Sequence, residues 1–187
     1  IGVWLTPAIN IHRTPLGGRN FEYYSEDPLV AGEMAAAMVE GIQSEGVGAS
    51  LKHFACNNKE TNRKDCDSRL SERALREIYL KGFELCVKKA QPLTVMSSYN
   101  LVNGLWASQN RELLTDILRG EWGFKGMVTT DWYTHAPQYT EIAAGNDVKM
   151  GCGDPAHVLQ MMREGRLKRE DVVVSVRRLL EMILKLA

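Results

Sequence analysis

Short apolar runs alternate with longer amphipathic segments along this chain. Between the runs, apolar residues recur at the spacing that places them on one face of a helix. Strands that alternate with helices in this way are joined by crossovers, so the pattern predicts parallel β/α units. The runs that have the length and composition of strands are residues 2–6, 49–54, 93–97, 126–130 and 147–150.

Capping residues mark where the helices begin and end. Asp27 as N-cap and Pro28 in the first turn predict a helix that ends near Glu45, before Gly46. Asn110 is placed to cap a later helix that contains a run of leucines. The other helices are expected at 71–89, 139–144, 156–164 and 170–186.

Polar residues cluster directly after the predicted strands, at 10–20, 52–63, 98–103, 131–132 and 151–154. In a (β/α) barrel the active site is built from the loops at the carboxyl ends of the strands. The sequence therefore predicts an α/β fold, a TIM-type barrel of which about the last five β/α units are present. A flavodoxin-like open sheet is the alternative, but no Gly-rich phosphate turn supports it.

Composition and charge narrow the classes of partner. The chain has 187 residues, enough for one domain with a substantial core, and 23 basic residues balance 23 acidic ones. A net charge of zero favours neither nucleic acid nor an anionic membrane. No apolar run approaches the roughly 18–20 residues that span a bilayer. We therefore expect no nucleic acid and no membrane among the partners.

The four cysteines form no CxxC pair, which argues against a zinc ribbon or a thioredoxin-like site. Free thiols in a reducing cytoplasm are the simplest interpretation, and a Cys56–Cys66 bridge is the alternative. We expect a bacterial cytoplasmic protein. Because the chain opens at Ile1 inside a predicted strand, its start looks like an internal cut, and a secreted or periplasmic location stays open.

Asp131 is the first candidate for chemistry, because it ends the strand at 126–130 beside Trp132. A carboxylate in this position can attack the anomeric carbon of a sugar. Such a nucleophile must stay ionised, so cationic or hydrogen-bonding neighbours are expected around it. The alternative is that Asp131 caps the following turn while Trp132 packs at the rim, and spacing alone leaves both open.

Several hydrogen-bond donors lie in the other loops. Lys52 and His53 are adjacent at a strand end, and because successive side chains alternate they are not expected to point into the core together. They are suited to binding vicinal hydroxyl groups. Arg19 lies in a Gly-rich loop that lacks the features of a phosphate loop, and Arg63 is a second loop cation. Tyr99 can donate to the nucleophile or to the sugar. Each of these residues, taken alone, is equally a structural or surface residue.

No metal or cofactor is expected. The four histidines match neither a helix-borne HExxH nor a CxxC clip. A catalytic acid is also not identified, since no spacing selects one among the loop carboxylates Glu22, Glu26, Glu60 and Asp154.

Taken together, five stretches resemble glycoside hydrolase family 3, in its β-glucosidase branch. They occur in the family's order and spacing and cover essentially the whole chain. The stretches are NIHRTPLGGRNFEYYSEDP (10–28), GVGASLKHFACNNKETNR (46–63), VMSSYNLVNG (95–104), LRGEWGFKGMVTTDW (118–132) and AAGNDVKMG (143–151).

The resemblance implies a (β/α) barrel, with residues 1–187 as its C-terminal part, that hydrolyses β-linked sugars with retention of configuration. The expected reaction releases terminal non-reducing β-D-glucosyl, or β-xylosyl, residues by double displacement through a covalent sugar intermediate. The family's nucleophile falls on Asp131. Its sugar-binding residues fall on Arg19, Lys52, His53, Arg63, Tyr99 and Trp132.

Two parts of the family's pattern lie outside the chain. An early-loop Asp that binds sugar hydroxyls would precede Ile1, and the general acid/base is usually a Glu on a separate α/β-sandwich domain. The loop after His53 also differs from the KHFPGHG loop of the N-acetylglucosaminidase branch. The expected partners are a β-linked oligosaccharide or an aryl or alkyl β-glucoside, the missing barrel segment and the sandwich domain, with a homo-oligomer also open. Two alternatives are a non-catalytic sugar-binding fragment and a metal-dependent barrel hydrolase.

Overall fold

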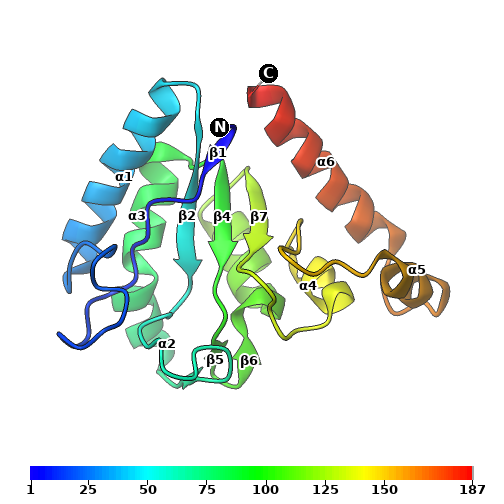
Figure 1. Cartoon of the computed structure of the whole chain (residues 1–187), viewed down its shortest axis with the longest axis horizontal. Helices are drawn as coiled ribbons and strands as arrows, with labels where there is room; N and C mark the ends of the chain where they lie inside the picture. The colour runs from blue at the N-terminus through cyan, green and yellow to red at the C-terminus, as the bar shows by residue number, and fades with distance from the viewer. Residues whose placement is uncertain (187) are drawn as a thin grey trace.

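A four-stranded parallel sheet forms the centre of the molecule (Figure 1). The computed structural model describes residues 1–186. The strand order is β1 (Val3–Trp4), β2 (Gly48–Phe54), β4 (Thr94–Ser97) and β7 (Met127–Thr130), and each neighbouring pair is parallel. Their carboxyl ends therefore meet at one edge, and the predicted α/β class with a parallel sheet is confirmed.

The first long helix begins where its capping signal predicts. The Asp27 carboxylate accepts hydrogen bonds from the amides of Leu29 and Val30 at 2.7 and 3.3 Å. These amides have no partner inside the helix, so the cap satisfies them. Helix α1 (Pro28–Ser44) follows and packs beside α3 (Lys81–Ala90) on one side of the sheet (Figure 1).

The other predicted helices are also present. The helix expected at 71–89 is a single helical run that Ser71 caps and that contains one wider, π-helical turn. Asn110 accepts from the amide of Leu113 at 3.2 Å and so caps the next helix, as expected. The elements are α2 (Glu72–Ala74), η1 (Leu75–Tyr79), α3 (Lys81–Ala90), η2 (Ala107–Gln109), η3 (Glu112–Glu121), α4 (Gln138–Ala144), α5 (Pro155–Arg163) and α6 (Arg169–Leu186).

The main core lies between the sheet and the helices α1, α3 and η3. Successive side chains of a strand point to opposite faces of the sheet, and here the two faces differ in polarity. The positions that join the apolar core are Ala49, Leu51, Val95 and Val128. The alternate positions, on the opposite face, carry small polar residues that are also buried, including Ser50, Thr94 and Thr129.

The fifth predicted strand, at 147–150, is wrong as an extended strand. Val148 makes one bridge with Thr129, and the rest of the segment does not continue the ladder. The cause is the Asp147 side chain, whose Oδ2 accepts from the amide of Val128 at 2.8 Å. A side chain thus occupies a position that a neighbouring strand's carbonyl would take in a regular sheet.

A small second sheet lies beyond the carboxyl ends of the main strands (Figure 1). It joins β3 (Asp67–Ser68) in parallel to β5 (Leu101–Val102), which forms a hairpin with β6 (Leu105–Trp106). The turn residues Asn103 and Gly104 have φ values of 51° and 88°. Asn-Gly is the usual pair for such a turn, because both positions need a positive φ.

All four cysteines are free, so the alternative Cys56–Cys66 bridge is not formed. Burial raises the pKa values of the Cys56 and Cys86 thiols to about 12, which keeps both protonated. In the part of the chain that the structure describes, no helix has the length and apolar character to cross a membrane.

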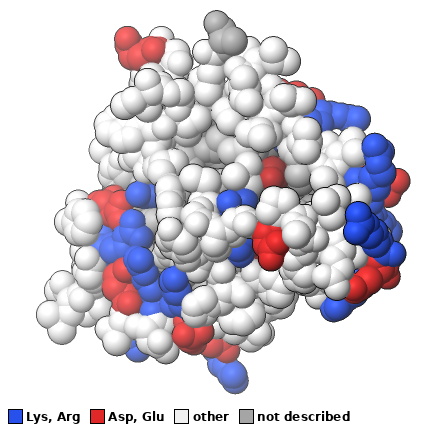
Figure 2. All heavy atoms as spheres, turned by 45° about the vertical axis from the view of Figure 1, so that its right-hand side comes forward, with Lys and Arg blue, Asp and Glu red and all other residues white. Residues whose placement is uncertain are grey.

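The surface charges are mixed. Figure 2 shows basic and acidic side chains interleaved on one face, at both sides and near its middle, with uncharged residues between them. No large area of one sign appears on this face, in keeping with the balanced composition.

Asp147 also ties the sheet to two helices. Its side chain is fully buried and accepts from Arg119 Nη2 at 2.9 Å and from Arg178 Nη1 at 3.0 Å. Burial raises the pKa of Asp147 against the opposing effect of the two arginines, and it lowers the pKa of Arg119 to about 10. The three groups connect η3, the edge of β7 and α6.

Removing Asp147 leaves buried arginine charge without a partner. We expect Asp147→Ala to lower the free energy of unfolding by about 3–5 kcal/mol, measured by urea denaturation. The matched control is Asp116→Ala, because Asp116 is exposed and lies 3.9 Å from Arg111. The control should change stability by less than about 0.5 kcal/mol. Equal losses in the two variants would contradict the role of the buried triad.

Candidate active site

Asp131 lies at the carboxyl edge of the sheet, immediately after β7. Its amide donates to the carbonyl of Ser97 at 3.1 Å, so the backbone is still held by the neighbouring strand. The residue is 7% exposed, and its Oδ1 accepts from the amide of Trp132 at 2.7 Å. Oδ2 makes no hydrogen bond within residues 1–186 and lies 3.8 Å from Nε2 of His53.

His53 reaches Asp131 from the end of β2, where the strand is irregular. The pairing of β2 with β4 shifts register between Leu51 and Phe54, which interrupts the regular alternation of side chains. Lys52 reaches Glu22 and His53 reaches Asp131, so the two adjacent side chains meet different partners at the same edge of the sheet. Asn10 fixes this segment, because its side chain accepts from the His53 amide at 3.0 Å and donates to the His53 carbonyl at 2.9 Å.

The His53 imidazole is held in its neutral form. Burial lowers its pKa well below the ordinary value, and the charges of Arg19, Lys52 and Arg63 act in the same direction. These three cations influence His53 because the fold gathers them around it. The contact between His53 and Asp131 is therefore one between a neutral ring and a carboxyl group.

Glu22 organises two of the predicted sugar-binding cations. Its Oε1 pairs with Nε of Arg19, and its Oε2 lies 3.2 Å from Nζ of Lys52. One carboxylate thus fixes a side chain of its own loop and a side chain at the end of β2. Sequence spacing did not single out Glu22, since the contact with Lys52 depends on how the loop folds onto the strand.

Glu60 fixes Arg63, the third of the predicted sugar-binding cations. It accepts from Arg63 Nη1 at 2.8 Å and from Asn57 Nδ2 at 3.3 Å. Arg63 lies over the ring of Tyr99, with 4.5 Å between the guanidinium carbon and the ring centroid. The separation is within the range of a cation–π contact, which keeps the guanidinium beside the site.

Tyr99 follows β4 and is nearly buried. Burial and the neighbouring Asp131 carboxylate raise the pKa of its hydroxyl to about 12. The hydroxyl therefore stays protonated and available as a donor. Its proximity in turn lowers the pKa of Asp131.

The net pKa of Asp131 differs from the expectation. The Trp132 amide, Tyr99, Arg19 and Arg63 all lower it, as predicted for a nucleophile that must be ionised. Burial has the larger effect, however, and the pKa is raised above the ordinary carboxyl value. The prediction of cationic neighbours is right in sign, but their effect is outweighed by desolvation.

Trp132 and Tyr133 follow Asp131 and lie against the segment around Gly151. A Cβ atom at Gly151 would lie 2.9 Å from Cδ1 of Trp132 and 3.0 Å from Cζ of Tyr133, and this glycine has a φ of 77°. Glycine is required here for both reasons. Sequence analysis placed Trp132 at the site but missed the support from Gly151.

The loop carboxylates considered as a catalytic acid have other roles. Glu22 and Glu60 are bound to the site cations. Asp154 caps α5 by accepting from the amide of His157 at 2.9 Å. Glu26 lies in an exposed turn beside Ser25. Among residues 1–186, no group of three or more His, Cys, Asp or Glu side chains is arranged to hold a metal ion.

Residues 1–182, which include every candidate residue named above, match the model of the glycosyl hydrolase family 3 N terminal domain. The chain belongs to this family.

Curated relatives agree with this membership. The chain is 58% identical over 171 residues to beta-glucosidase A of Butyrivibrio fibrisolvens, an alignment that covers 91% of the chain and 21% of that protein. It is 51% identical over 171 residues to an exo-alpha-(1->6)-L-arabinopyranosidase of Bifidobacterium breve, covering 89% of the chain and 22% of the relative. The chain thus spans about a fifth of the length of these relatives.

Solved structures share the fold closely. Beta-glucosidase 3B from Thermotoga neapolitana, in complex with glucose, superposes with a TM-score of 0.97 at 49% identity, over 99% of this chain and 27% of that one. The beta-glucosidase of Bifidobacterium adolescentis gives a TM-score of 0.96 at 45% identity, over 100% of this chain and 28% of that one. The α/β architecture of the family's N-terminal domain is therefore that of this chain.

The raised pKa of Asp131 makes a prediction about stability. A carboxyl group whose folded pKa exceeds its unfolded one binds its proton more tightly in the folded state, so ionising it costs stability as the pH rises through the folded pKa. We expect Asp131→Asn to increase the free energy of unfolding at neutral pH. The difference from the wild type should disappear near pH 3, below the ordinary carboxyl pKa of about 3.9. Urea denaturation across this range measures it, with the exposed Asp116→Asn as control. A gain that persists unchanged at low pH would show that another effect is responsible.

Proposed function

We propose that this chain is the C-terminal part of the catalytic barrel of a retaining β-glycosidase, with Asp131 as the nucleophile. The observation that carries the proposal is the Asp131 carboxyl group, whose Oδ2 lacks a hydrogen bond within the described residues and lies 3.8 Å from the neutral His53. Around it are Lys52 from the end of β2 and Arg19 and Arg63 from two loops of the same edge.

The donors suit a neutral sugar. Lys52 and the two arginines are fixed by Glu22 and Glu60, so they can present N–H groups to hydroxyl oxygens without rearrangement. Neutral His53 has one nitrogen to donate and one to accept, which matches a hydroxyl group that does both. Preorganised contacts of this kind lower the entropic part of the barrier.

The substrate class follows from the relatives. One of the two curated relatives above carries a beta-glucosidase name, and the Thermotoga neapolitana structure holds glucose. We propose terminal non-reducing β-D-glucosyl groups as the substrate, with β-xylosyl groups as the second candidate. An α-L-arabinopyranoside, the substrate in the name of the Bifidobacterium breve relative, has an equatorial bond at its anomeric carbon as a β-glucoside has. Asp131 would therefore attack the anomeric carbon from the same side in both.

The reaction proceeds in two displacements. Ionised Asp131 attacks the anomeric carbon and forms a glycosyl ester while the aglycone oxygen leaves with a proton. Water then attacks the same carbon and returns Asp131 as a carboxylate, so the configuration is retained. Above its raised pKa, Asp131 is a more basic carboxylate than an exposed one. The nearby Tyr99, Arg19 and Arg63 favour the ionised form.

A second carboxyl group is needed about 5–5.5 Å from the nucleophile. Glu22, Glu60 and Asp154 are engaged elsewhere. We propose that the acid/base comes from outside residues 1–187, on an α/β-sandwich domain, and that the remaining barrel strands also lie outside. On this proposal the isolated chain is weakly active or inactive. Separately, because the four cysteines are free, we propose that the whole protein is cytoplasmic and bacterial.

Replacing the nucleophile tests the proposal in the native polypeptide that contains these residues. We expect Asp131→Asn to lower kcat for an aryl β-glucoside on the order of 10⁴-fold or more. Azide should rescue Asp131→Gly and yield the α-glycosyl azide, because the small anion replaces the missing carboxylate.

A 2-deoxy-2-fluoro-glucoside with a good leaving group should label Asp131 in the wild type, with the added mass located by peptide mass spectrometry. A sugar-binding fragment without catalysis would bind glucose but acquire no label. Loss of activity on adding a chelator would instead favour a metal-dependent hydrolase.

The role of the cations has a separate test. Lys52→Met keeps the length of the side chain but removes its donors. We expect it to raise KM for the aryl β-glucoside about tenfold or more, since a hydrogen bond from a charged group contributes about 1.5–3 kcal/mol. Lys59→Met is the control, because Lys59 is an exposed residue of the same loop region. Equal effects of the two changes would remove Lys52 from the sugar site.

A further inference from the structure

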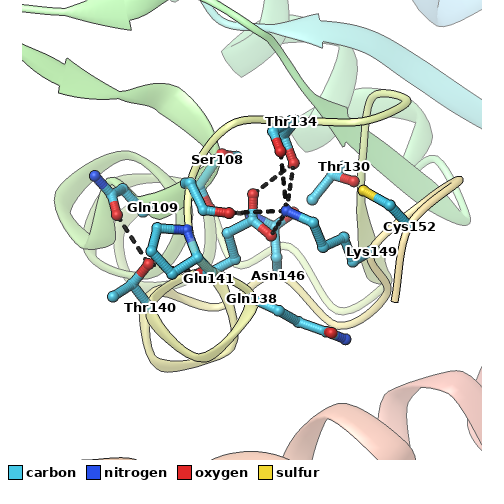
Figure 3. Close-up of polar contacts among 12 residues, drawn as sticks. Ser108, Gln109, Thr130, Thr134, Gln138, Thr140, Glu141, Asn146, Lys149 and Cys152 are labelled. Atoms are coloured by element: carbon cyan, nitrogen blue, oxygen red, sulfur yellow. Dashed lines mark hydrogen bonds and ion pairs between the residues drawn. The ribbon is translucent and has the colours of Figure 1, made fainter. Parts of the chain in front are cut away.

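A buried ion pair lies behind the loop that follows Asp131. Nζ of Lys149 is 2.8 Å from Oε2 of Glu141, and the two side chains are only 8% and 1% exposed. Figure 3 shows the Lys149 side chain pointing into a group of oxygen atoms that come from α4 and from the loop before it. The roles assigned above to the sugar-binding and catalytic residues do not use this pair.

The groups that accept hydrogen bonds from the Lys149 ammonium show which part of the chain the ion pair restrains. They include the main-chain carbonyls of Ala136 at 2.8 Å and Thr134 at 3.2 Å, and the Thr134 hydroxyl at 3.0 Å. That hydroxyl donates to Oε1 of Glu141 at 2.6 Å, which closes the network (Figure 3). An ammonium has three donors, and all of them are directed at this loop and its adjoining helix.

The energetics favour a geometric role over a simple contribution to stability. Two buried charges lose their hydration, and a well-packed apolar pair of the same size is often as stable or more so. An apolar pair, however, cannot hold two carbonyl groups in fixed directions. The pair therefore does something that an apolar replacement would not do, which is to fix the backbone at 134–136.

The segment that carries Lys149 also contacts the chain just before and just after Asp131. Met150, the next residue after Lys149, accepts from the amide of Tyr133 at 3.1 Å through its carbonyl and donates from its amide to Thr130 Oγ1 at 3.0 Å. Gly151 then packs against Trp132. The chain at 149–151 thus contacts the residues before and after Asp131.

Two further polar contacts of this loop are exposed to solvent. Lys64 donates to the Tyr133 carbonyl at 3.0 Å, and His135 lies 3.2 Å from Asp65. Exposed polar contacts of this kind contribute little, because water competes for the same groups. Of the side-chain hydrogen bonds made to this loop, the buried Lys149 network is consequently the main restraint.

We propose that Lys149, Glu141 and Thr134 are positioning residues that set the orientation of Asp131 and Trp132 through the backbone of residues 131–137. The proposal deepens the glycosidase function and rests on it. None of the three residues contacts the sugar. They act by holding the loop that carries Asp131 and Trp132.

The decisive variant is the double change Glu141→Gln and Lys149→Met in the native polypeptide. It removes both charges together, so no buried charge is left unpaired, and the glutamine can still accept from Thr134. Because methionine cannot bind the two carbonyls, the loop loses its restraint. We expect kcat/KM for an aryl β-glucoside to fall about tenfold to a hundredfold, mainly in kcat, since a displacement of about 1 Å has effects of this size.

Two further comparisons separate positioning from general destabilisation. Thr134→Ser keeps the hydroxyl and should keep wild-type kcat, whereas Thr134→Val should lose activity in the same way as the double variant. Val87→Ala removes volume from the main core, to which Val87 contributes from α3, and Val87 is not part of the loop at 131–137. It should lower the melting temperature with no change in kcat when assayed well below that temperature.

Hydrogen–deuterium exchange of peptides that span 131–137 gives a readout independent of catalysis. The double variant should exchange faster there than the wild type, and Val87→Ala should not. The positioning role is overturned if the double variant keeps both wild-type kcat/KM and wild-type exchange. If the wild type itself neither hydrolyses nor is labelled by the fluoro-glycoside, the glycosidase proposal fails. The exchange data then decide alone whether the network orders the loop.

Discussion

The parallel ladder between β2, β4 and β7 is the constraint on which the proposed site depends. It continues past the ends of the strands, since the Ser98 amide donates to the Phe54 carbonyl at 2.8 Å and the Asp131 amide donates to the Ser97 carbonyl at 3.1 Å. Residues that are distant in sequence are thereby placed side by side at one edge. A shift of one residue in this register would turn the side chain of Asp131 to the opposite face of the sheet.

Within that frame, burial and charge act differently on the two central groups. Burial disfavours the charged form of both, and so raises the pKa of Asp131 and lowers that of His53. The charges of Arg19 and Arg63 oppose burial at the carboxyl group and reinforce it at the imidazole. The cations therefore favour an ionised acid next to an uncharged ring, whereas burial alone would favour the uncharged form of both groups.

Local signals in the sequence predicted most of the architecture. Apolar runs located the four strands of the main sheet, and the caps at Asp27 and Asn110 located helix starts, because both depend on neighbouring residues only. The Asn103-Gly104 pair is an equally local signal for the hairpin between β5 and β6, since both residues adopt a positive φ. The segment around Val148 was misjudged, since its pairing is replaced by a side-chain contact of Asp147 that depends on tertiary structure.

The site was predicted unevenly for the same reason. The positions of Asp131, Lys52 and His53 after strands pointed to one edge, and the family resemblance added the loop cations. The register shift in β2 and the pairing of Glu22 with Lys52 were not visible, because each arises between segments far apart in the chain. The sign of the Asp131 pKa shift depended on how deeply the group is buried, and sequence does not give that depth.

On the proposed function, the pairing of Glu22 with Arg19 and Lys52 has a consequence for which sugars the site would discriminate. Glu22, Glu60 and an ionised Asp131 balance the charge of the three cations, so the proposed site offers many N–H groups but little net positive field. A uronic acid would thus gain little attraction over an uncharged hexose, and would have to compete with these carboxylates for the same cationic groups. Selection in such a site would rest on the directions of the individual hydroxyl groups.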